Sequence, residues 1–352
     1  MKVHSTLCVY IDCIDTYSSN NAGVCHPCPV GAVCKHGNIS ALENYRLIYA
    51  SDNSVTVFKC PESFCKADQQ CYPHRHGWLC ELCDEGYVAF GKSCIECSQT
   101  NGGFVFLFLL VLFLISVALL LISGRGQSGY PKIFIYFVQM ISLVINPVRS
   151  WLLSFIDIFN SGFSSADVCV GVIDYYGKIS VKLMLPFMST GYIAIIYCVH
   201  AIVMKIRKNH IPNVHQYFGC ILNVLIFFYM SIATTCLNYL HCETVAGEYV
   251  NVYEPSIHCD SAKYKDFSVI VYFIFLTYTI CFPIGTILLL FWGWKRKKLT
   301  DPYFSKHYGA LYKAYKTHQF WWEDVVLLRK LVLVTVFVFV ANISQKQVRF
   351  SS

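Results

Sequence analysis

A run of twenty residues without a charged side chain, "FVFLFLLVLFLISVALLLIS" from Phe104 to Ser123, limits the possible folds of this chain more than any other feature. A helix needs about 20 mainly apolar residues to cross the hydrocarbon core of a bilayer. A helix that is apolar on every side lies either in a membrane or at the centre of a large soluble protein. We expect a membrane span here.

Five more apolar runs of similar length follow the first. Together they predict a membrane all-α fold, a six-helix transmembrane bundle with spans at about 104–123, 133–153, 182–204, 217–237, 267–294 and 325–343. Pro283 interrupts the fifth run, and Arg329 and Lys330 lie inside the sixth. The chain is 14% charged, against about 25% in ordinary globular domains. Six such runs favour a membrane bundle over a large soluble helical protein.

The first 98 residues differ in composition, because they contain twelve of the nineteen cysteines and no long apolar run. Three C-x-x-C pairs would suit zinc, but zinc leaves the cysteines between the pairs without a role. So small a region also buries too little apolar area to be stable without covalent bridges. We therefore expect disulfides there, with candidates Cys25, Cys28, Cys34, Cys60, Cys65, Cys71, Cys80, Cys83, Cys94 and Cys97, and a further loop pair, Cys242 and Cys259.

These features predict three regions: a small disulfide-rich N-terminal ectodomain at 1–98, a multispan domain at 99–346 and a short tail at 347–352. Lysine and arginine mark the cytoplasmic loops of membrane proteins. Loops 124–132, 205–216 and 295–324 are basic, whereas loop 238–266 has five acidic residues and two lysines. This pattern predicts an integral plasma-membrane protein whose head is extracellular. The sequon at Asn38 is a glycosylation candidate that fits this orientation.

The stretch "QFWWEDVVLLRKL" before and within the sixth run supplies the gating or interface candidates. Trp321 and Trp322 have the composition of an interfacial belt, and residues 308–316 that of an amphipathic helix on the inner leaflet. Glu323, Arg329 and Lys330 follow; a gating linker and a plain anchor both fit them. Gln139, in the second span, is either an interhelical hydrogen-bonding group or part of a permeation path.

Motifs of soluble enzymes and nucleic-acid-binding proteins are absent from the sequence. It has no G-x-S-x-G, Walker loop, dinucleotide fingerprint or kinase signature, and its histidines form no metal-binding motif. The net charge of +7 comes from short basic clusters beside apolar runs, which is an orientation signal and not a phosphate-binding face. We expect neither an enzyme nor a nucleic-acid partner, and no metal or other cofactor; the bilayer is the expected partner.

Several phrases resemble known families. "CHPCPVGAVC" and "GWLCELCDEGYVAFGKSCIEC" resemble the Cys-rich repeats of ephrin-receptor-like and EGF-like modules. "PKIFIYFVQMISLV", the outer loop with Cys242 and Cys259, and "YGALYKAYKTHQFWWEDVVLLRKL" together resemble the C-terminal domain of transient-receptor-potential-like membrane proteins of fungi and protists, over about residues 100–346. Members of that family continue with further spans that would hold a pore, so the resemblance implies that this chain is truncated.

The resemblance implies a subunit of a transient-receptor-potential-like cation channel with a sensing or adhesive Cys-rich head. The alternatives are a non-conducting cell-surface receptor or adhesion protein, and a small-solute transporter. An unidentified extracellular ligand and a homo-oligomer are the partners that these functions would involve.

Overall fold

A computed structural model describes residues 16–18, 25–36, 38–49, 55–60, 63–77, 79–90, 93–96, 102–124, 129–144, 175–207, 214–245, 248–254 and 256–341. The chain forms two compact units. Of the described residues, the first contains those between 16 and 96 together with those between 242 and 261, and the second contains those between 102 and 241 and between 262 and 341. The loop after the fourth predicted span thus belongs to the Cys-rich unit, although 145 residues separate it from that unit in the sequence.

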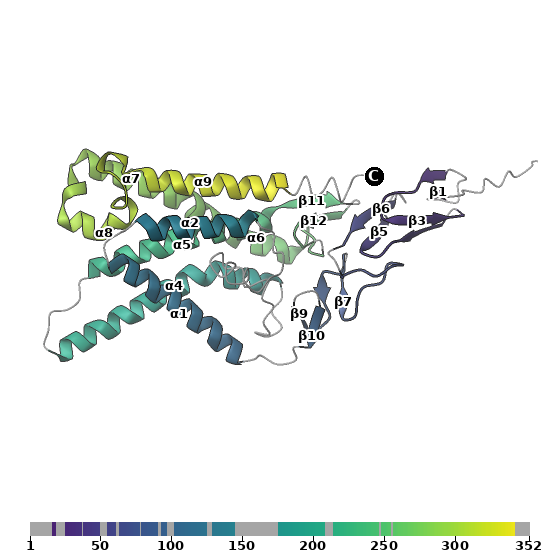
Figure 1. Ribbon diagram of the computed structural model, residues 1–352, viewed down its shortest axis with the longest axis horizontal. Coiled ribbons are helices and arrows are strands. Elements are labelled where there is room, and N and C mark those ends of the chain that lie inside the picture. The colour runs from purple at the N-terminus through teal and green to yellow at the C-terminus, as the bar shows by residue number, and fades with distance from the viewer. Residues whose placement is uncertain are drawn as a thin grey trace, which may run out of the picture. The chain divides into compact units, whose positions relative to one another are not determined.

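The Cys-rich unit is made of two-stranded antiparallel hairpins (Figure 1). Isolated hairpins are marginal in water, so each of these needs support from outside its own ladder. The described pairs are β1 (Thr16–Ser18) with β2 (Cys25–Pro27), β3 (Ala32–Lys35) with β4 (Asn38–Ala41), β5 (Tyr45–Tyr49) with β6 (Val55–Lys59), β7 (Arg75–His76) with β8 (Leu82–Cys83), β9 (Tyr87–Phe90) with β10 (Ser93–Glu96), and β11 (Cys242–Val245) with β12 (Glu248–Asn251).

Disulfides supply that support. The described bridges are Cys28–Cys34, Cys60–Cys65, Cys71–Cys80, Cys83–Cys94 and Cys242–Cys259. Cys60, Cys65 and Cys80 also form the small buried core of the unit, with Phe58 and Leu79. Covalent closure of short loops compensates for the little apolar area that such a unit buries.

The second unit is helical. Its elements are α1 (Gly102–Gly124), α2 (Gly129–Val144), α4 (Tyr175–Ile206), α5 (Val214–Leu240), α6 (Ala262–Ile274), η1 (Phe275–Cys281), α7 (Phe282–Lys295), η2 (Lys298–Thr300), α8 (Pro302–Tyr312), η3 (Thr317–Gln319), α9 (Trp322–Val336) and η4 (Phe337–Ala341). Four helical stretches are long and apolar enough to cross a membrane: Val105–Ile122, Tyr175–Ile206, Tyr217–Leu240 and Ala262–Lys295. The protein is therefore an integral membrane protein.

Six spans were expected, and two of them do not meet these criteria of length and composition. For the second, α2 is described over only 16 residues, and positions 145–153 lie outside the described part of the chain. For the sixth, α9 and η4 reach 341, but Glu323, Asp324, Arg329 and Lys330 make this helix more charged than an ordinary span. Positions 342–343 lie outside the described residues.

Helix α5 is the central helix of the bundle. Within its apolar window 72% of residues are buried, against 11–17% in the other three candidate spans. Helix α1 shows the opposite pattern, with Phe106 67% exposed and Leu114 55% exposed. Large apolar side chains that face outward in this way are stable where lipid replaces water around the bundle. The side chains that α5 contacts, in contrast, form a packed protein interior.

Pro283 does not break the fifth run but changes its helix type. The helix continues from Ala262 to Lys295, and its π-helical segment η1 ends at Cys281, two residues before the proline. Proline has no N–H, so it cannot donate to the carbonyl of Thr279 four residues earlier. The hydroxyl of Tyr229 on α5 donates to that carbonyl instead, at 2.9 Å. The expected break is therefore a local widening that a neighbouring helix satisfies.

The segment expected to lie on the inner leaflet packs partly into the bundle. Asp301 caps α8 by accepting from the N–H of Tyr303 at 3.0 Å, and Pro302 begins the helix. Phe304 and Tyr312 are buried in one cluster with residues of α5, α7 and α9. A Cβ at Gly293 would come within 2.7 Å of the Phe304 ring, so the glycine permits this close approach.

Candidate functional site: a buried polar ladder and cavity

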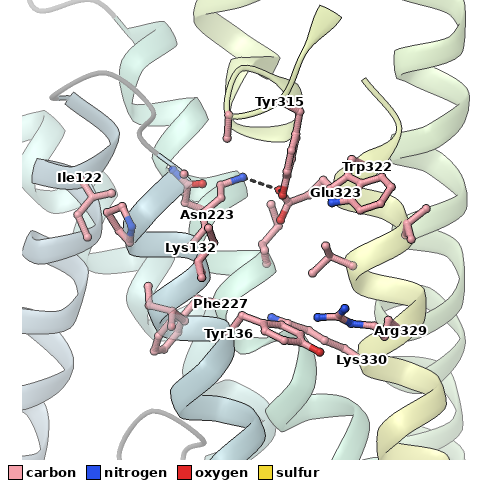
Figure 2. Close-up of a pocket in the computed structure, with 18 of the residues that line it drawn as sticks. Ile122, Lys132, Tyr136, Asn223, Phe227, Tyr315, Trp322, Glu323, Arg329 and Lys330 are labelled. Atoms are coloured by element: carbon pink, nitrogen blue, oxygen red, sulfur yellow. Dashed lines mark hydrogen bonds and ion pairs between the residues drawn. The ribbon is translucent and has the colours of Figure 1, made fainter. Parts of the chain in front are cut away.

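Polar and charged side chains of α2 and α9 meet inside the helical unit (Figure 2). They border a cavity of about 400 Å³ whose walls also include residues of α1 and α5. Charged groups are rare at such positions in membrane bundles, because desolvation of an unpaired charge is costly. The pairing of each group therefore decides what the site can do.

Lys132 on α2 and Glu323 on α9 form an ion pair. The Lys132 Nζ atom lies 2.6 Å from Glu323 Oε2 and also donates to the carbonyl of Ala310 at 2.6 Å. The side chain of Lys132 is 21% exposed, and that of Glu323 is 4% exposed. The same carboxylate oxygen accepts from the Tyr315 hydroxyl at 2.9 Å. Two donors therefore stabilise the negative charge of a nearly inaccessible carboxylate.

The environment of Tyr315 keeps its hydroxyl protonated. Burial, and then the neighbouring Glu323 carboxylate, raise the pKa of this tyrosine above its usual value. The phenol therefore remains a hydrogen-bond donor to Glu323 over the whole physiological range.

A second contact joins the same two helices. The Lys330 Nζ atom donates to Gln139 Oε1 at 2.9 Å, and Gln139 Nε2 donates to the carbonyl of Phe227 on α5 at 2.8 Å. Lys330 is 3% exposed and Gln139 is fully buried. The amide group thus connects α9 to both α2 and α5.

The two contacts repeat with one spacing on both helices. Lys132 and Gln139 are seven residues apart on α2, and Glu323 and Lys330 are seven apart on α9. Seven residues span about 10.5 Å of helix and return to nearly the same face. The pairs Lys132–Glu323 and Gln139–Lys330 therefore form a two-step polar ladder between parallel helices. We call these four residues the α2–α9 ladder.

Two further charged groups of α9 lie beside the ladder. The Arg329 guanidinium carbon is 4.4 Å from the centroid of the Tyr136 ring, which is a cation–π contact. Asp324 accepts a hydrogen bond from the Thr286 hydroxyl on α7. Successive residues of α9 thus contact different helices, and Asp324 is not part of the cavity wall.

The structure brings together four of the six gating or interface candidates, Gln139, Glu323, Arg329 and Lys330. Trp322 also lines the cavity and is 41% exposed; its ring lies 5.7 Å from that of Trp321, which is 39% exposed. The cation paired with Glu323 is Lys132 of α2, and not Arg329 or Lys330 of its own helix. Sequence reasoning did not select Lys132, Tyr136 or Tyr315, although the shared seven-residue spacing is visible in the sequence.

The cysteine candidates of the head are paired across the C-x-x-C motifs and not within them. Cys80 bonds to Cys71, and Cys83 bonds to Cys94. The side chain of Cys25 and all of Cys97 lie outside the described residues. Within the described part of the chain, no group of three or more His, Cys, Asp or Glu side chains could hold a metal ion. Asn38, the glycosylation candidate, is exposed at the start of β4.

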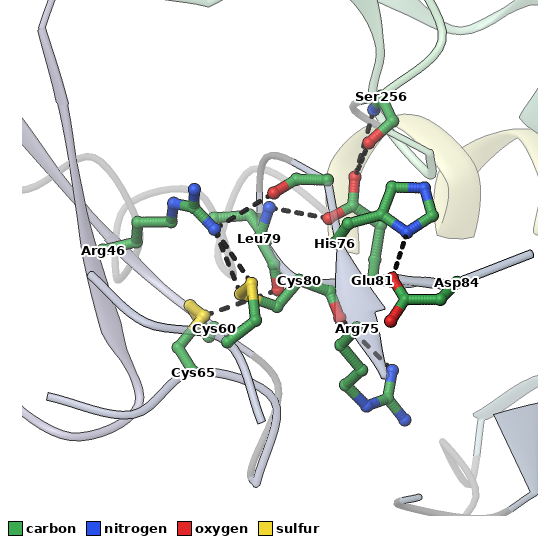
Figure 3. Close-up of a disulfide and its surroundings, with 12 residues drawn as sticks. Arg46, Cys60, Cys65, Arg75, His76, Leu79, Cys80, Glu81, Asp84 and Ser256 are labelled. Carbon is green, nitrogen blue, oxygen red and sulfur yellow. Dashed lines mark hydrogen bonds and ion pairs between the residues drawn. A yellow bond between two sulfur atoms is a disulfide. The ribbon is translucent and has the colours of Figure 1, made fainter. Parts of the chain in front are cut away.

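One carboxylate connects two parts of the Cys-rich unit that are distant in the sequence (Figure 3). Glu81 accepts from the N–H of Leu79 at 2.6 Å, and from the N–H of Ser256 at 3.1 Å. It also accepts from the hydroxyl of Ser256. Nearby, Arg46 Nη1 lies 3.2 Å from Cys71 Sγ and 3.0 Å from the carbonyl of Gly77. Loop 242–261 is thus attached to the head by charge-assisted hydrogen bonds.

No protein-family model, curated protein or solved structure matches this chain.

Proposed function

We propose that this chain is the sensing part of a cation-channel-like surface membrane protein. In this proposal α9 is the moving element, and the α2–α9 ladder keeps it in one of two positions. The observation that carries the proposal is the ladder itself: two polar pairs with the same seven-residue spacing on both helices, in which Gln139, Glu323 and Lys330 are almost completely buried. Ionisable groups paired inside a membrane bundle commonly mark switching or transport elements.

The ladder is suited to a two-position element because intermediate positions are costly. A shift of α9 by one helical turn, about 5.4 Å, would separate Glu323 from Lys132 and leave both charges poorly solvated. An aliphatic interface would allow gradual sliding, whereas a polar interface favours discrete registers. The π-helical segment η1 and the partly buried α8 lie before α9 in the same unit, and they would transmit its movement.

The proposed orientation has the Cys-rich unit outside the cell, in the plasma membrane. Two features support it: disulfides persist in oxidising compartments, and the basic loops predicted for the other side fit the positive-inside rule. The proposed partners are the bilayer, an extracellular ligand of the head and further copies of the chain. The protein would not be an enzyme.

Reconstitution of the full-length protein in planar bilayers would test the proposal. We expect cation currents whose opening shifts when Glu323 is replaced by Gln, because this change removes the single negative charge of the ladder while preserving the size of the side chain. Lys313→Gln, at an exposed position after α8, is the matched control and should leave opening unchanged. Absence of current under chemical, mechanical and voltage stimuli, with retained ligand binding by the head, would reject a channel.

A non-conducting receptor is the second candidate, and the Glu81–Ser256 attachment favours it. Through Ser256, a ligand on the head would act on loop 242–261, which directly connects α5 to α6. Such a protein would need no pore. Two results together would identify a receptor. The native protein would carry no current, and the Glu81→Gln variant would lose a ligand-dependent conformational signal that the native protein gives.

A further inference from the structure

The cavity beside the α2–α9 ladder is lined by an unequal number of charges. Its polar wall contains three basic side chains, Lys132, Arg329 and Lys330, and one acidic side chain, Glu323. Because Glu323 is paired with Lys132, the other two cations are not balanced by a carboxylate of the cavity wall. A cavity of this kind attracts an anion.

Arg329 and Lys330 have donors to offer such an anion. Within the described residues, Arg329 stacks on Tyr136 but no acceptor of its guanidinium hydrogens is found, and Lys330 donates to Gln139 with one of its three hydrogens. The carboxamide of Asn223 on α5 also lines the cavity. These groups can bind the oxygens of a phosphate.

The remaining walls are apolar and reach the lipid-facing surface. Leu119 and Ile122 of α1 and Ile226 of α5 line the cavity, which at about 400 Å³ lies within the range of small-ligand sites. Ile133 on α2 is 67% exposed, and Trp322 on α9 is 41% exposed, so the cavity wall reaches the surface on both helices. Figure 2 shows Arg329, Lys330 and Tyr136 together on one side of the space and Ile122 on the other.

We propose that this cavity binds the phosphate headgroup of an anionic glycerophospholipid, from the leaflet at the C-terminal end of α1. Arg329 and Lys330 bind the phosphate, Asn223 donates to the glycerol ester region, and the acyl chains lie along the exposed apolar faces of α1 and α2. A zwitterionic lipid is bound less well, because its ammonium group is repelled by the two cations. The proposal that this cavity binds an anionic lipid does not depend on whether the protein conducts ions.

The test uses the purified full chain in nanodiscs of phosphatidylcholine with and without dioleoyl phosphatidic acid. Binding is measured as lipid retained in native mass spectrometry and as the rise in thermal midpoint. We expect the Arg329→Gln, Lys330→Gln double variant to bind phosphatidic acid about tenfold more weakly or worse, since each charge-assisted hydrogen bond contributes substantially. The matched control is Arg296→Gln with Lys298→Gln, which removes equal charge at two side chains that stack on Trp292 outside the cavity. It should change binding by less than about twofold.

A further arm adds inorganic phosphate in place of phosphatidic acid. An equal effect of phosphate would assign the site to a free anion and overturn the lipid proposal. An equal loss of phosphatidic acid binding in the control variant would overturn the lipid proposal as well, because the lipid would then be attracted by the positive surface charge in general and not by this cavity.

A crosslinking experiment tests the site even if the double variant does not fold. Phosphatidic acid with a photoreactive acyl chain is crosslinked to the native protein. We expect labelled peptides from α1 near Ile122 and from α2 near Ile133; labelling confined to other helices would refute the site.

Discussion

The ion pair between Lys132 and Glu323 gives the sharpest quantitative prediction. Removing one member of a buried pair costs about 3–5 kcal/mol, because the other charge stays buried without compensation. The carboxylate that stays behind, Glu323, keeps its hydrogen bond from the Tyr315 hydroxyl, so the lower end applies. We expect Lys132→Met to destabilise the protein by about 3 kcal/mol.

Replacement of the other member of the pair, Glu323, should lower the free energy of unfolding by less. Glu323→Gln keeps an amide oxygen that accepts from Lys132 and Tyr315, so only the charge assistance of two hydrogen bonds is lost. Charged hydrogen bonds exceed neutral ones by about 1 kcal/mol each, which predicts a cost of about 2 kcal/mol. The double variant Lys132→Met, Glu323→Gln has no buried charge at this step of the ladder and should cost about 3 kcal/mol in total.

A double-mutant cycle therefore predicts a coupling energy of about 2 kcal/mol between the two positions. The assay is equilibrium unfolding in mixed micelles, with a denaturing detergent as the perturbant and tryptophan fluorescence as the signal. Lys313→Met, at an exposed site, is the control and should stay within about 0.5 kcal/mol of the native protein. Additivity of the two single changes within about 0.5 kcal/mol would refute the ion pair as a coupled unit.

Three further predictions concern other parts of the chain. Tyr229→Phe should cost about 1–2 kcal/mol, because the carbonyl of Thr279, four residues before Pro283, loses its donor. In a Pro283→Ala background the cost should be under half of that, because a backbone N–H replaces the lost donor; unfolding of the native protein, the two single variants and the double variant measures this. Replacing Cys242 and Cys259 by Ser should destabilise the Cys-rich unit by about 3 kcal/mol, as expected for a loop of this length, and proteolysis of loop 242–261 should rise in parallel. If the head is extracellular, the mass that N-glycosidase removes from protein of eukaryotic cells should be smaller by one glycan in Asn38→Gln than in the native protein; an equal loss of mass in both would contradict glycosylation at this site.

The apolar runs could be recognised from sequence because the bilayer imposes a simple requirement of length and polarity. Four of them correspond to span-like helices in the structure. The run at 325–343 was also predicted to be a span, but it does not meet the same criteria of length and polarity in the structure. The surroundings of Arg329 and Lys330 within it could not be predicted from the run alone. Their actual environment depends on α2, which is about 190 residues distant. No local pattern contains that information.

The burial of α8 was also beyond local reasoning. Its aromatic and lysine residues have the composition of an interfacial helix. In the structure, Phe304 enters a space that exists because Gly293 of α7 has no side chain. The disulfide pairing is a third example, because C-x-x-C spacing suggests neighbours while the fold pairs Cys80 with Cys71 and Cys83 with Cys94. In each case a contact between separate elements decided the outcome.

Lys330 is both a member of the α2–α9 ladder and, in the proposed lipid site, a ligand of the phosphate, and this double role links the two proposals thermodynamically. If an anionic headgroup binds more tightly when Lys330 remains near Gln139, it stabilises that register of α9 by the difference in its affinity for the two positions. By reciprocity, any signal that moves α9 away must weaken the lipid by the same factor. Glu323 opposes the anion by charge, since it is the acidic member of the cavity wall. Neutralising it should therefore weaken the ladder and strengthen the lipid at once, so the lipid would offset part of the cost of Glu323→Gln.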